Sequence, residues 1–394
     1  MSHAQALYAW EERLATRFAE LPAHERSWLA WVSGGIVLAQ AALLSQVVMA
    51  LAVAFDLGYN TVRQRLRRLY QPRPRPDRPL TFDYTACFGP LLRWVTAGFP
   101  QHRLLLALDP TNLGDRFTIL TASVVFRGSA VPVAWNVRGA DEKGSWNTQW
   151  QRLLDLLHAA LGAGWQVVVL GDRGLQSKDL FDAIVALGWH PLLRVKKAGH
   201  FRPKGWTQGW ALGRFAPHVG TAWKGVGVAW PTSSRLSCTL LACWEEGHAE
   251  PWLLVTDLAP AAATAAWYGW RTWIEGGFRD LKSDGWQVSK TRMTDPERVA
   301  RWWTAVALAT VWTLEAGQTA QHLELPALRT LVGVDQPLVL SLFAVGRAWL
   351  AAQITRGHVR RLRQLRQPPW PTETHTCNRL SEKKWLAEHN DVPL

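Results

Sequence analysis

Hydrophobic and polar residues follow two different periods along the middle of the chain, and together they predict a mixed α/β fold. Short, continuous apolar runs predict buried strands, whereas longer stretches with apolar residues every three or four positions predict helices. The expected strands span 103–108, 117–125, 130–137, 166–170 and 190–195, and the expected helices span 146–161 and 178–187. The predicted order is therefore three strands, a helix, a strand, a helix and a strand.

That order is typical of a ribonuclease H-like core, in which the first and fourth strands are neighbours. The first strand ends at Asp109 and the fourth at Asp172. The ends of these neighbouring strands would bring the two carboxylates together. Asp257 also ends an apolar run, and Asp115 lies six residues past Asp109, so spacing alone favours the pair Asp109 and Asp172 without excluding these rivals.

A second carboxylate pattern lies on a helix expected from about residue 264 to 282. Tyr268, Arg271, Glu275 and Lys282 are separated by two, three and six residues. At 100° per residue the last three fall at about −60°, −20° and −40° from Tyr268, so all four share one narrow stripe. A carboxylate beside a guanidinium, an ammonium and a phenol suits a phosphate group and the metal that activates it.

The first eighty residues predict an all-helical unit. An apolar helix leads through the turn Leu57-Gly58-Tyr59 into a basic helix that we expect to begin with Asn60 as its N-cap. A helix, a glycine turn and a basic second helix are the parts of a helix-turn-helix, which places its second helix in the major groove of DNA. The cations expected to contact DNA from this helix are Arg63, Arg65 and Arg67. A helical hairpin with a solvated basic face is the alternative.

Residues 27–55 contain no charged side chain, a length that could span a bilayer. Small and polar residues such as Ser33-Gly34-Gly35, Gln40 and Gln46 favour two buried helices with a break instead. The rest of the chain has no second candidate span. The N-terminus has neither a basic leader nor a cleavage site. We therefore expect a cytoplasmic protein with no membrane partner.

Residues 183–244 contain eight cations and no carboxylate, with tryptophans and glycines between them. The pattern is not helical and predicts a β-rich insertion, closed by a hairpin from 239–244 and 252–256. A basic, acid-free and aromatic surface is suited to a phosphate backbone and to stacking with bases. Lys196, Lys197 and Lys204 are the candidates for phosphate contacts.

Composition agrees with a nucleic-acid partner. The 394 residues carry a formal net charge of +13, which favours a polyanionic ligand. Four cysteines follow no metal-ligand spacing and indicate scattered thiols in a reducing compartment. If the carboxylates converge, oxygen-only ligands favour Mg²⁺, with Mn²⁺ able to substitute, and two such ions would serve an in-line phosphodiester displacement.

The motifs resemble those of bacterial insertion-sequence transposases of the DDE type, in the cut-and-paste subgroup with the Tyr-(2)-Arg-(3)-Glu-(6)-Lys signature. The resemblance covers about residues 103–317, through Leu108-Asp109-Pro110-Thr111, Gly171-Asp172-Arg173-Gly174, 268–275, 278–283 and Lys290-Thr291-Arg292. One departure is Gly276-Gly277, where larger residues are usual. Two glycines inside a helix cost roughly 2 kcal/mol relative to alanine, and they either permit close packing or bend the stripe.

The resemblance implies roles for the motif residues. Asp109, Asp172 and Glu275 would be the catalytic, metal-binding triad, and Tyr268, Arg271 and Lys282 would hold the terminal phosphate of the transposon end. Members of the family cut transposon ends, insert them into target double-stranded DNA and act as homodimers on DNA. The family also uses an insertion-domain tryptophan to hold a flipped base, for which Trp244 and Trp252 are the candidates here.

The sequence thus predicts an α/β protein whose ribonuclease H-like catalytic core is interrupted by a β-rich insertion. The expected units are a helical DNA-binding domain at 1–80 with a basic linker at 71–80, the core at 81–195 and 263–320, the basic insertion at 196–262, and a helical C-terminal region with a basic tail at 321–394. We expect a bacterial, nucleoid-associated transposase. A ribonuclease H-like nuclease or resolvase that cuts without joining is one alternative, and a domesticated, inactive transposase that only binds DNA is another.

Overall fold

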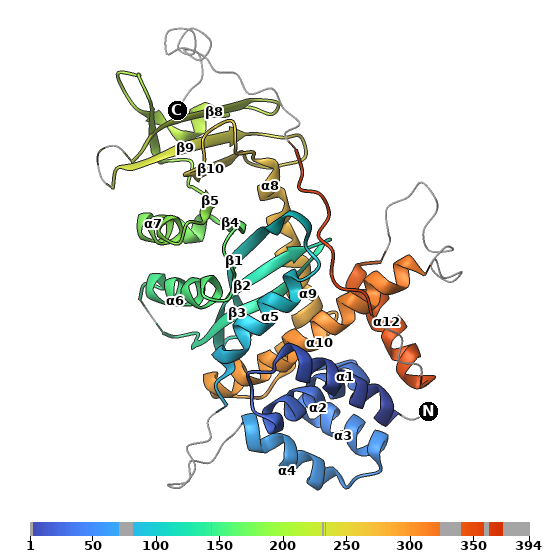
Figure 1. Cartoon of the computed structure of the whole chain (residues 1–394). Coiled ribbons are helices and arrows are strands. Elements are labelled where there is room, and N and C mark those ends of the chain that lie inside the picture. The colour runs from blue at the N-terminus through green and yellow to red at the C-terminus, as the bar shows by residue number, and fades with distance from the viewer. Residues whose placement is uncertain are drawn as a thin grey trace.

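The computed structural model describes residues 3–70, 82–142, 144–230, 232, 234–323, 340–357 and 362–372. Within these residues a helical unit at the N-terminal end, a mixed α/β core and a β-rich end follow one another along the molecule (Figure 1). The basic linker 71–80, Cys377 and most of the expected C-terminal tail lie outside the described residues. Cys87, Cys238 and Cys243 are buried thiols without disulfides.

The N-terminal unit is helical as predicted. Its helices are α1 (His3–Arg17), α2 (Ala23–Ala39), α3 (Leu44–Phe55) and α4 (Tyr59–Tyr70). The break expected in the uncharged segment lies between α2 and α3. Gly34 and Gly35 are inside α2, where Leu7 of α1 and Leu51 of α3 occupy the space that a Cβ would need. Glycine at these two positions therefore lets three helices pack closely.

No single helix in the described residues is both long enough and apolar enough to cross a membrane. The helices α2 and α3 pass that test only as a pair, and the pair is bent by 94°. Much of α2 is buried, and it packs against α1, α3 and the long helix α10 (Pro296–His322).

The core sheet has the neighbour relations that the sequence predicted. Its strands are β1 (Arg103–Leu113), β2 (Phe117–Phe126), β3 (Ser129–Gly139), β4 (Gln166–Gly171) and β5 (His190–Arg194). β1 pairs with β2 antiparallel and with β4 parallel, and β4 pairs with β5 parallel. The prediction that the first and fourth strands are neighbours is confirmed. The helix α5 (Phe88–Thr96) precedes β1. The helices between the strands are α6 (Asn147–His158) and α7 (Lys178–Ala186).

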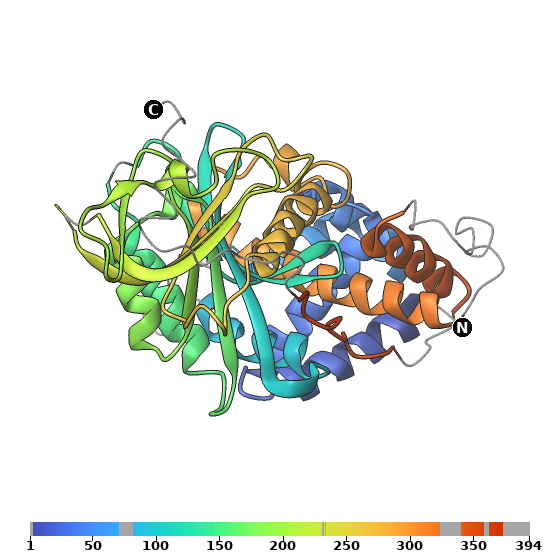
Figure 2. The ribbon, with the colours of Figure 1, turned by 90° about the horizontal axis from the view of Figure 1, so that it is seen from above.

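The β-rich segment continues the core sheet instead of forming a sheet of its own. Its strands are β6 (His200–Pro203), β7 (Trp210–Ala211), β8 (Ala222–Ala229), β9 (Leu236–Cys243) and β10 (Trp252–Thr256). The described strands follow the order β3-β2-β1-β4-β5-β10-β9-β8-β6-β7. The expected hairpin is present as β9 and β10, and β10 joins the core by pairing with β5. Figure 2 shows this sheet beside the helical layer that covers it.

Helices complete the C-terminal half. The expected continuous helix 264–282 is three pieces, α8 (Ala266–Gly269), a 3₁₀ turn (Trp270–Thr272) and α9 (Trp273–Lys282). α10 begins after Asp295, whose side chain accepts a 2.8 Å hydrogen bond from the Arg298 N–H, and Pro296 lies in its first turn. α10 is buried along most of its length, and α12 (Leu342–Thr355) packs against it.

The C-terminal region expected to be helical over 321–394 is not helical throughout, because residues 362–372 are extended. This segment, which we call the strap, runs from the α10 and α12 region toward α8 (Figure 1). Arg360 and Arg361 lie outside the described residues. Side chains of α10 hold the strap backbone: the Arg363 N–H donates to Thr319 Oγ1 and the Arg366 N–H donates to Gln318 Oε1. Backbone groups used in this way are not available for helical hydrogen bonds.

Candidate active site

Asp109 and Asp172 lie side by side because their strands are parallel neighbours. Leu108 of β1 pairs with Gly171, the last residue of β4, so the next residue on each chain is a carboxylate. The expectation that β1 ends at Asp109 is wrong. β1 continues to Leu113 because β2 still pairs with it there, whereas β4 has ended. Asp109 therefore lies on a rigid strand and Asp172 at the start of a loop.

The guanidinium of Arg271 joins the three predicted carboxylates. Its Nη2 donates a 2.8 Å hydrogen bond to Asp109 Oδ1 and lies 3.9 Å from Asp172 Oδ2, and its Nη1 lies 3.6 Å from Glu275 Oε1. The Arg271 side chain is 10% exposed, whereas the Glu275 side chain is 70% exposed. Three carboxylates thus share one buried cation.

Tyr268 and Lys282 approach the same strand ends. The Tyr268 hydroxyl donates a 3.3 Å hydrogen bond to Asp172 Oδ1. Lys282 Nζ donates to Thr111 Oγ1 at 2.8 Å and to the Asn112 carbonyl at 3.2 Å, two and three residues past Asp109 on β1. All four residues of the predicted stripe therefore face the ends of β1 and β4, although a 3₁₀ turn interrupts the helix between Tyr268 and Glu275.

The glycine pair after Glu275 allows close packing and does not disrupt α9. A Cβ on Gly276 would lie 2.8 Å from the Gly128 carbonyl oxygen, and one on Gly277 would lie 2.8 Å from the Ala130 backbone nitrogen. Residues with side chains would push α9 off the β2–β3 turn. The two glycines therefore set the distance between α9 and the sheet, and with it the position of Glu275.

Burial and charge shift the site's titrations in opposite directions. Burial raises the pKa of the Asp109 carboxyl, and the Arg271 charge offsets that rise only in part. Burial also tends to raise the pKa of Asp172, but the Arg173 backbone N–H, with Arg271 and Arg194, leaves it below its ordinary value. The surroundings therefore disfavour the charged form of Asp109 and favour the charged form of Asp172.

The side chains from α8 and α9 also have shifted titrations. Burial raises the pKa of the Tyr268 phenol well above its ordinary value, so the phenol stays neutral and remains a hydrogen-bond donor. Burial lowers the pKa of the Lys282 ammonium, which the charge of Asp109 partly opposes. Two donors of different charge therefore flank the carboxylates.

Arg194 is a site residue that the sequence analysis counted only among the cations of the acid-free stretch. Its Nη1 lies 3.9 Å from Asp172 Oδ1, and its Nη2 lies 3.5 Å from Glu250 Oε2. Glu250 also pairs with Arg173 at 2.7 Å. The signal was available, because Arg194 ends β5, the parallel neighbour of β4, and adjacent parallel strands end at the same edge of a sheet.

The rival carboxylates lie elsewhere. Asp115 is exposed in the turn between β1 and β2. Asp257 follows β10 and lies 2.9 Å from His190 Nδ1. Among the described residues, the carboxylate partners of Arg271 are Asp109, Asp172 and Glu275, and neither rival is one of them.

The carboxylates fit a hard divalent cation in ligand type and charge, since all their donors are oxygen and they already gather around a cationic group. Among the described residues, no three His, Cys, Asp or Glu side chains form a group that could hold a metal ion as they stand. The Arg271 guanidinium lies between 2.8 and 3.9 Å from an oxygen of each of the three carboxylates.

The cations expected on α4 are presented unequally. Arg63 and Arg65 are exposed, whereas Arg67 is half-buried. Arg65 also lies over the Trp31 ring, 5.9 Å from its centroid. The expectation that Asn60 caps this helix is wrong. α4 begins at Tyr59, and the Val62 N–H donates to the Gly58 carbonyl, so Asn60 lies in the first turn.

In the β-rich segment the lysines and the tryptophans behave differently. Lys196, Lys197 and Lys204 are exposed. Trp223 is 6% exposed and its ring centroid lies 4.6 Å from that of Phe215, so this tryptophan is part of the core. The prediction that the interleaved tryptophans supply stacking surfaces does not hold for Trp223.

The two flipped-base candidates are packed differently. Trp252 is 9% exposed and lies between His248 and Tyr268, with centroid distances of 4.6 and 5.5 Å. Trp244 is half-buried, and its Nε1 donates a 2.8 Å hydrogen bond to the His248 carbonyl. Trp252 therefore packs against Tyr268 of α8.

Comparison with known proteins identifies a family. The family model described as the Transposase DDE domain matches residues 114–312, about half of the chain, and this segment contains Asp172 and Glu275 but begins after Asp109. Among solved structures, the chain is similar to the cryo-EM structure of the piggyBac transposase synaptic complex with hairpin DNA. The two are 12% identical, with a TM-score of 0.35 over 64% of this chain and 53% of that chain. The chain thus spans about half the length of that relative. No curated protein matches.

Proposed function

Because the chain belongs to the Transposase DDE domain family, we propose that it cuts DNA at transposon ends and joins the freed ends to target DNA. The observation that carries the proposal is the convergence of Asp109, Asp172 and Glu275 on one guanidinium at the ends of β1 and β4. The strand order around these ends supports a ribonuclease H-like core. The residue spacing from Tyr268 to Lys282 supports the cut-and-paste subgroup of bacterial insertion sequences.

In this proposal the three carboxylates hold Mg²⁺ or Mn²⁺, with two ions as the expected number. Bound there, such ions would supply Lewis-acid activation of water or a 3′-hydroxyl and would stabilise the leaving oxygen. Asp109 is fixed by its strand and Asp172 by the Tyr268 hydroxyl. Glu275 is the most exposed of the three and is the carboxylate with most room to turn toward a ligand.

Arg271, Lys282 and Tyr268 would grip the DNA end. A guanidinium that now balances Asp109 can instead bind a phosphate through two N–H groups once cations balance the acids. Lys282 is held by Thr111 and Asn112 beside Asp109, where its positive charge would lie next to the reacting phosphate. The neutral Tyr268 phenol orients Asp172. These contacts would fix the reacting groups in line.

Exposed cations on α4 and in the β-rich segment would hold the remainder of the DNA. We propose that Arg63 and Arg65, and Lys196, Lys197 and Lys204, contact phosphates, because they are exposed and lie outside the carboxylate cluster. Arg67, which is half-buried, would contribute less. The protein would act on cytoplasmic, nucleoid DNA as a homodimer on two transposon ends.

The test is cleavage of a labelled duplex carrying the inverted repeat that flanks the gene. Glu275→Gln is nearly isosteric and removes the charge, so it should abolish Mg²⁺-dependent cleavage while end binding persists. Glu297→Gln is the matched control, because Glu297 is also exposed on a helix beside an arginine but lies away from the cluster. A wild-type protein that binds ends and never cuts them, or a Glu275→Gln variant that cuts normally, would refute the proposal. A wild type that cuts without joining would indicate a nuclease.

A further inference from the structure

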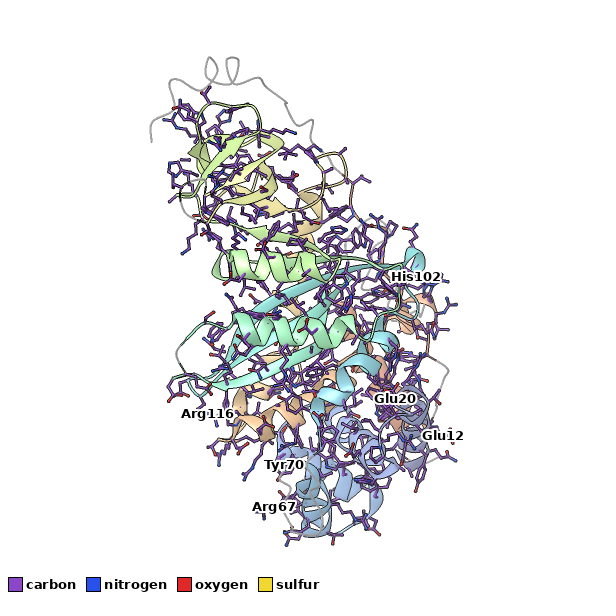
Figure 3. All side chains as sticks on the ribbon, turned by 60° about the vertical axis from the view of Figure 1, so that its left-hand side comes forward. Glu12, Glu20, Arg67, Tyr70, His102 and Arg116 are labelled. Atoms are coloured by element: carbon purple, nitrogen blue, oxygen red, sulfur yellow. The ribbon has the colours of Figure 1, made fainter. Side chains whose placement is uncertain are left out.

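A large cleft lies at the start of β1, away from the carboxylates. Its volume is about 1450 Å³. It is bounded by α1, by residues 97–103 at the start of β1, by the end of α10 and by the strap. In Figure 3, Glu12 of α1 and His102 beside β1 lie on the same side of the molecule. The volume exceeds the range of about 300–1,000 Å³ that suits a small-molecule site.

The cleft is lined by arginines from three different parts of the chain, namely Arg13, Arg17, Arg103, Arg363 and Arg366, and by a single carboxylate, Glu12. The charge of Arg13 is balanced by Glu315, which it contacts at 2.8 Å. Arg103 lies over the Trp370 ring and donates to Gln166. Arg17, Arg363 and Arg366 have no carboxylate within ion-pair distance among the described residues.

The strap presents its arginines to the cleft because its backbone is fixed. Gln318 and Thr319 of α10 accept hydrogen bonds from the strap's N–H groups, and Gln318 also donates to the Gln364 carbonyl. Leu365 is 1% exposed, whereas Arg363 and Arg366 are exposed. The strap therefore forms one wall of the cleft with two exposed guanidinium groups, and Arg17 of α1 also lines the cleft.

The cleft is too far from the carboxylates to hold the scissile phosphate. Arg103 precedes Asp109 by six residues on the same strand. At 3.2–3.4 Å per residue the two positions are roughly 20 Å apart. About six base pairs of duplex DNA cover that distance. A longer duplex could contact both places at once.

We propose that this cleft binds the sugar–phosphate backbone of duplex DNA several base pairs from the site of cleavage. The inference rests on the proposed function, which supplies DNA as the ligand, and adds an anchoring surface that uses no catalytic residue. The guanidinium groups of α1 and of the strap suit phosphate oxygens, which accept paired N–H donors. Anchoring here would increase affinity for any sequence, because backbone contacts carry no direct base readout.

The probe is a fluorescein-labelled 30-base-pair duplex of random sequence, titrated with full-length protein at several KCl concentrations. The triple variant Arg17→Gln, Arg363→Gln and Arg366→Gln should bind at least tenfold more weakly at low salt. Its slope of log K against log salt should be shallower by roughly 2 to 3, since each lost phosphate contact removes about 0.9. The control variant Arg26→Gln, Arg127→Gln and Arg356→Gln changes the net charge equally, and none of its residues lines the cleft.

The strap variant Arg363→Gln with Arg366→Gln guards against a folding artefact, because both side chains are exposed. It should melt like the wild type. Its slope should change by about two-thirds as much as that of the triple variant, because it lacks two of the three arginines. A cleft variant that keeps the wild-type slope, or that loses no more affinity than the control, would overturn the inference and leave the proposed function standing. A wild type that binds no duplex at all would instead count against the proposed function.

Discussion

Two groups of carboxylates and arginines in this molecule hold their acids in different ways. At the joint between α1, α5 and α10, Glu315 is fully buried and accepts hydrogen bonds from Arg13 Nη2 at 2.8 Å and Trp94 Nε1 at 2.9 Å. At the ends of β1 and β4, three carboxylates share the one guanidinium of Arg271. The acid of the first cluster has two donors of its own, whereas the three acids of the second converge on Arg271, with Arg194 3.9 Å from Asp172 and Lys282 beside Asp109.

That difference separates a structural joint from a reactive site. Burial raises the pKa of Glu315, while Arg13 and Trp94 oppose the rise, so the group acts within a closed network. Burial also raises the pKa of Asp109, but Asp109 shares its partner, Arg271, with Asp172 and Glu275. The proposed function adds divalent cations as ligands of the three carboxylates, whereas Glu315 has no such proposed ligand.

The largest expected effect breaks the site and leaves the joint intact. Asp109→Asn should lower the rate of DNA-end cleavage by roughly 10³-fold or more, because a carboxylate that would hold the cations is lost. Asp257→Asn is the control, since Asp257 also follows a strand but pairs with His190. Cleavage rates on one labelled duplex give the comparison. Full activity in Asp109→Asn with loss in Asp257→Asn would move the site to the other strand end.

The next effect breaks the joint and leaves the site intact. Glu315→Ala should lower the free energy of unfolding by about 3 kcal/mol, because it leaves the Arg13 charge and the Trp94 N–H without their buried partner. Urea denaturation measures the loss. Cleavage by the folded fraction should be unchanged. A variant as stable as the wild type would show that the α1–α10 contact does not depend on this network.

A smaller effect sharpens the charge argument at the site itself. Arg271→Gln removes the shared cation and leaves three carboxylates facing one another, which should cost about 1–2 kcal/mol at pH 7 without metal. Millimolar Mg²⁺ should restore most of the lost thermal stability, and should stabilise the wild type less. Equal responses to Mg²⁺ in the two proteins would argue against competition between Arg271 and cations.

The smallest effect concerns Asp280, an acid on α9, the helix that also carries Glu275. Burial raises the pKa of Asp280 to about 6, although Ser129 donates a hydrogen bond to it. Its charged form is therefore disfavoured in the fold, so the penalty is absent below about pH 4 and complete above about pH 6. Asp280→Asn should raise the free energy of unfolding by about 1 kcal/mol at pH 8 and leave it unchanged at pH 4. Equal shifts at both pH values would contradict this origin.

Much of the core could be predicted because its signals are local. Apolar runs located the five strands of the core. Errors arose where a distant partner decides the local structure. β1 extends past Asp109 because β2 pairs with it, and the strap is extended because Gln318 and Thr319 hold its backbone.

The candidate site was predictable in its members but not in its contacts. Helical spacing placed Tyr268, Arg271 and Glu275 on one face, and strand order placed Asp109 beside Asp172. That Arg271 bridges the acids depends on rotamers and on the Gly276-Gly277 contact with the β2–β3 turn, which no local pattern encodes. Arg194 was missed as a site residue because its role follows from a neighbouring strand.

The most direct measurement of the central claim is cation binding without DNA. Mn²⁺ titrated into the protein and followed by electron paramagnetic resonance reports bound ions independently of cleavage. The account predicts binding to the wild type and to Glu315→Gln, and loss of binding in Glu275→Gln and in Asp109→Asn. Equal Mn²⁺ binding by all four proteins, or none by the wild type, would contradict a cation site at the ends of β1 and β4.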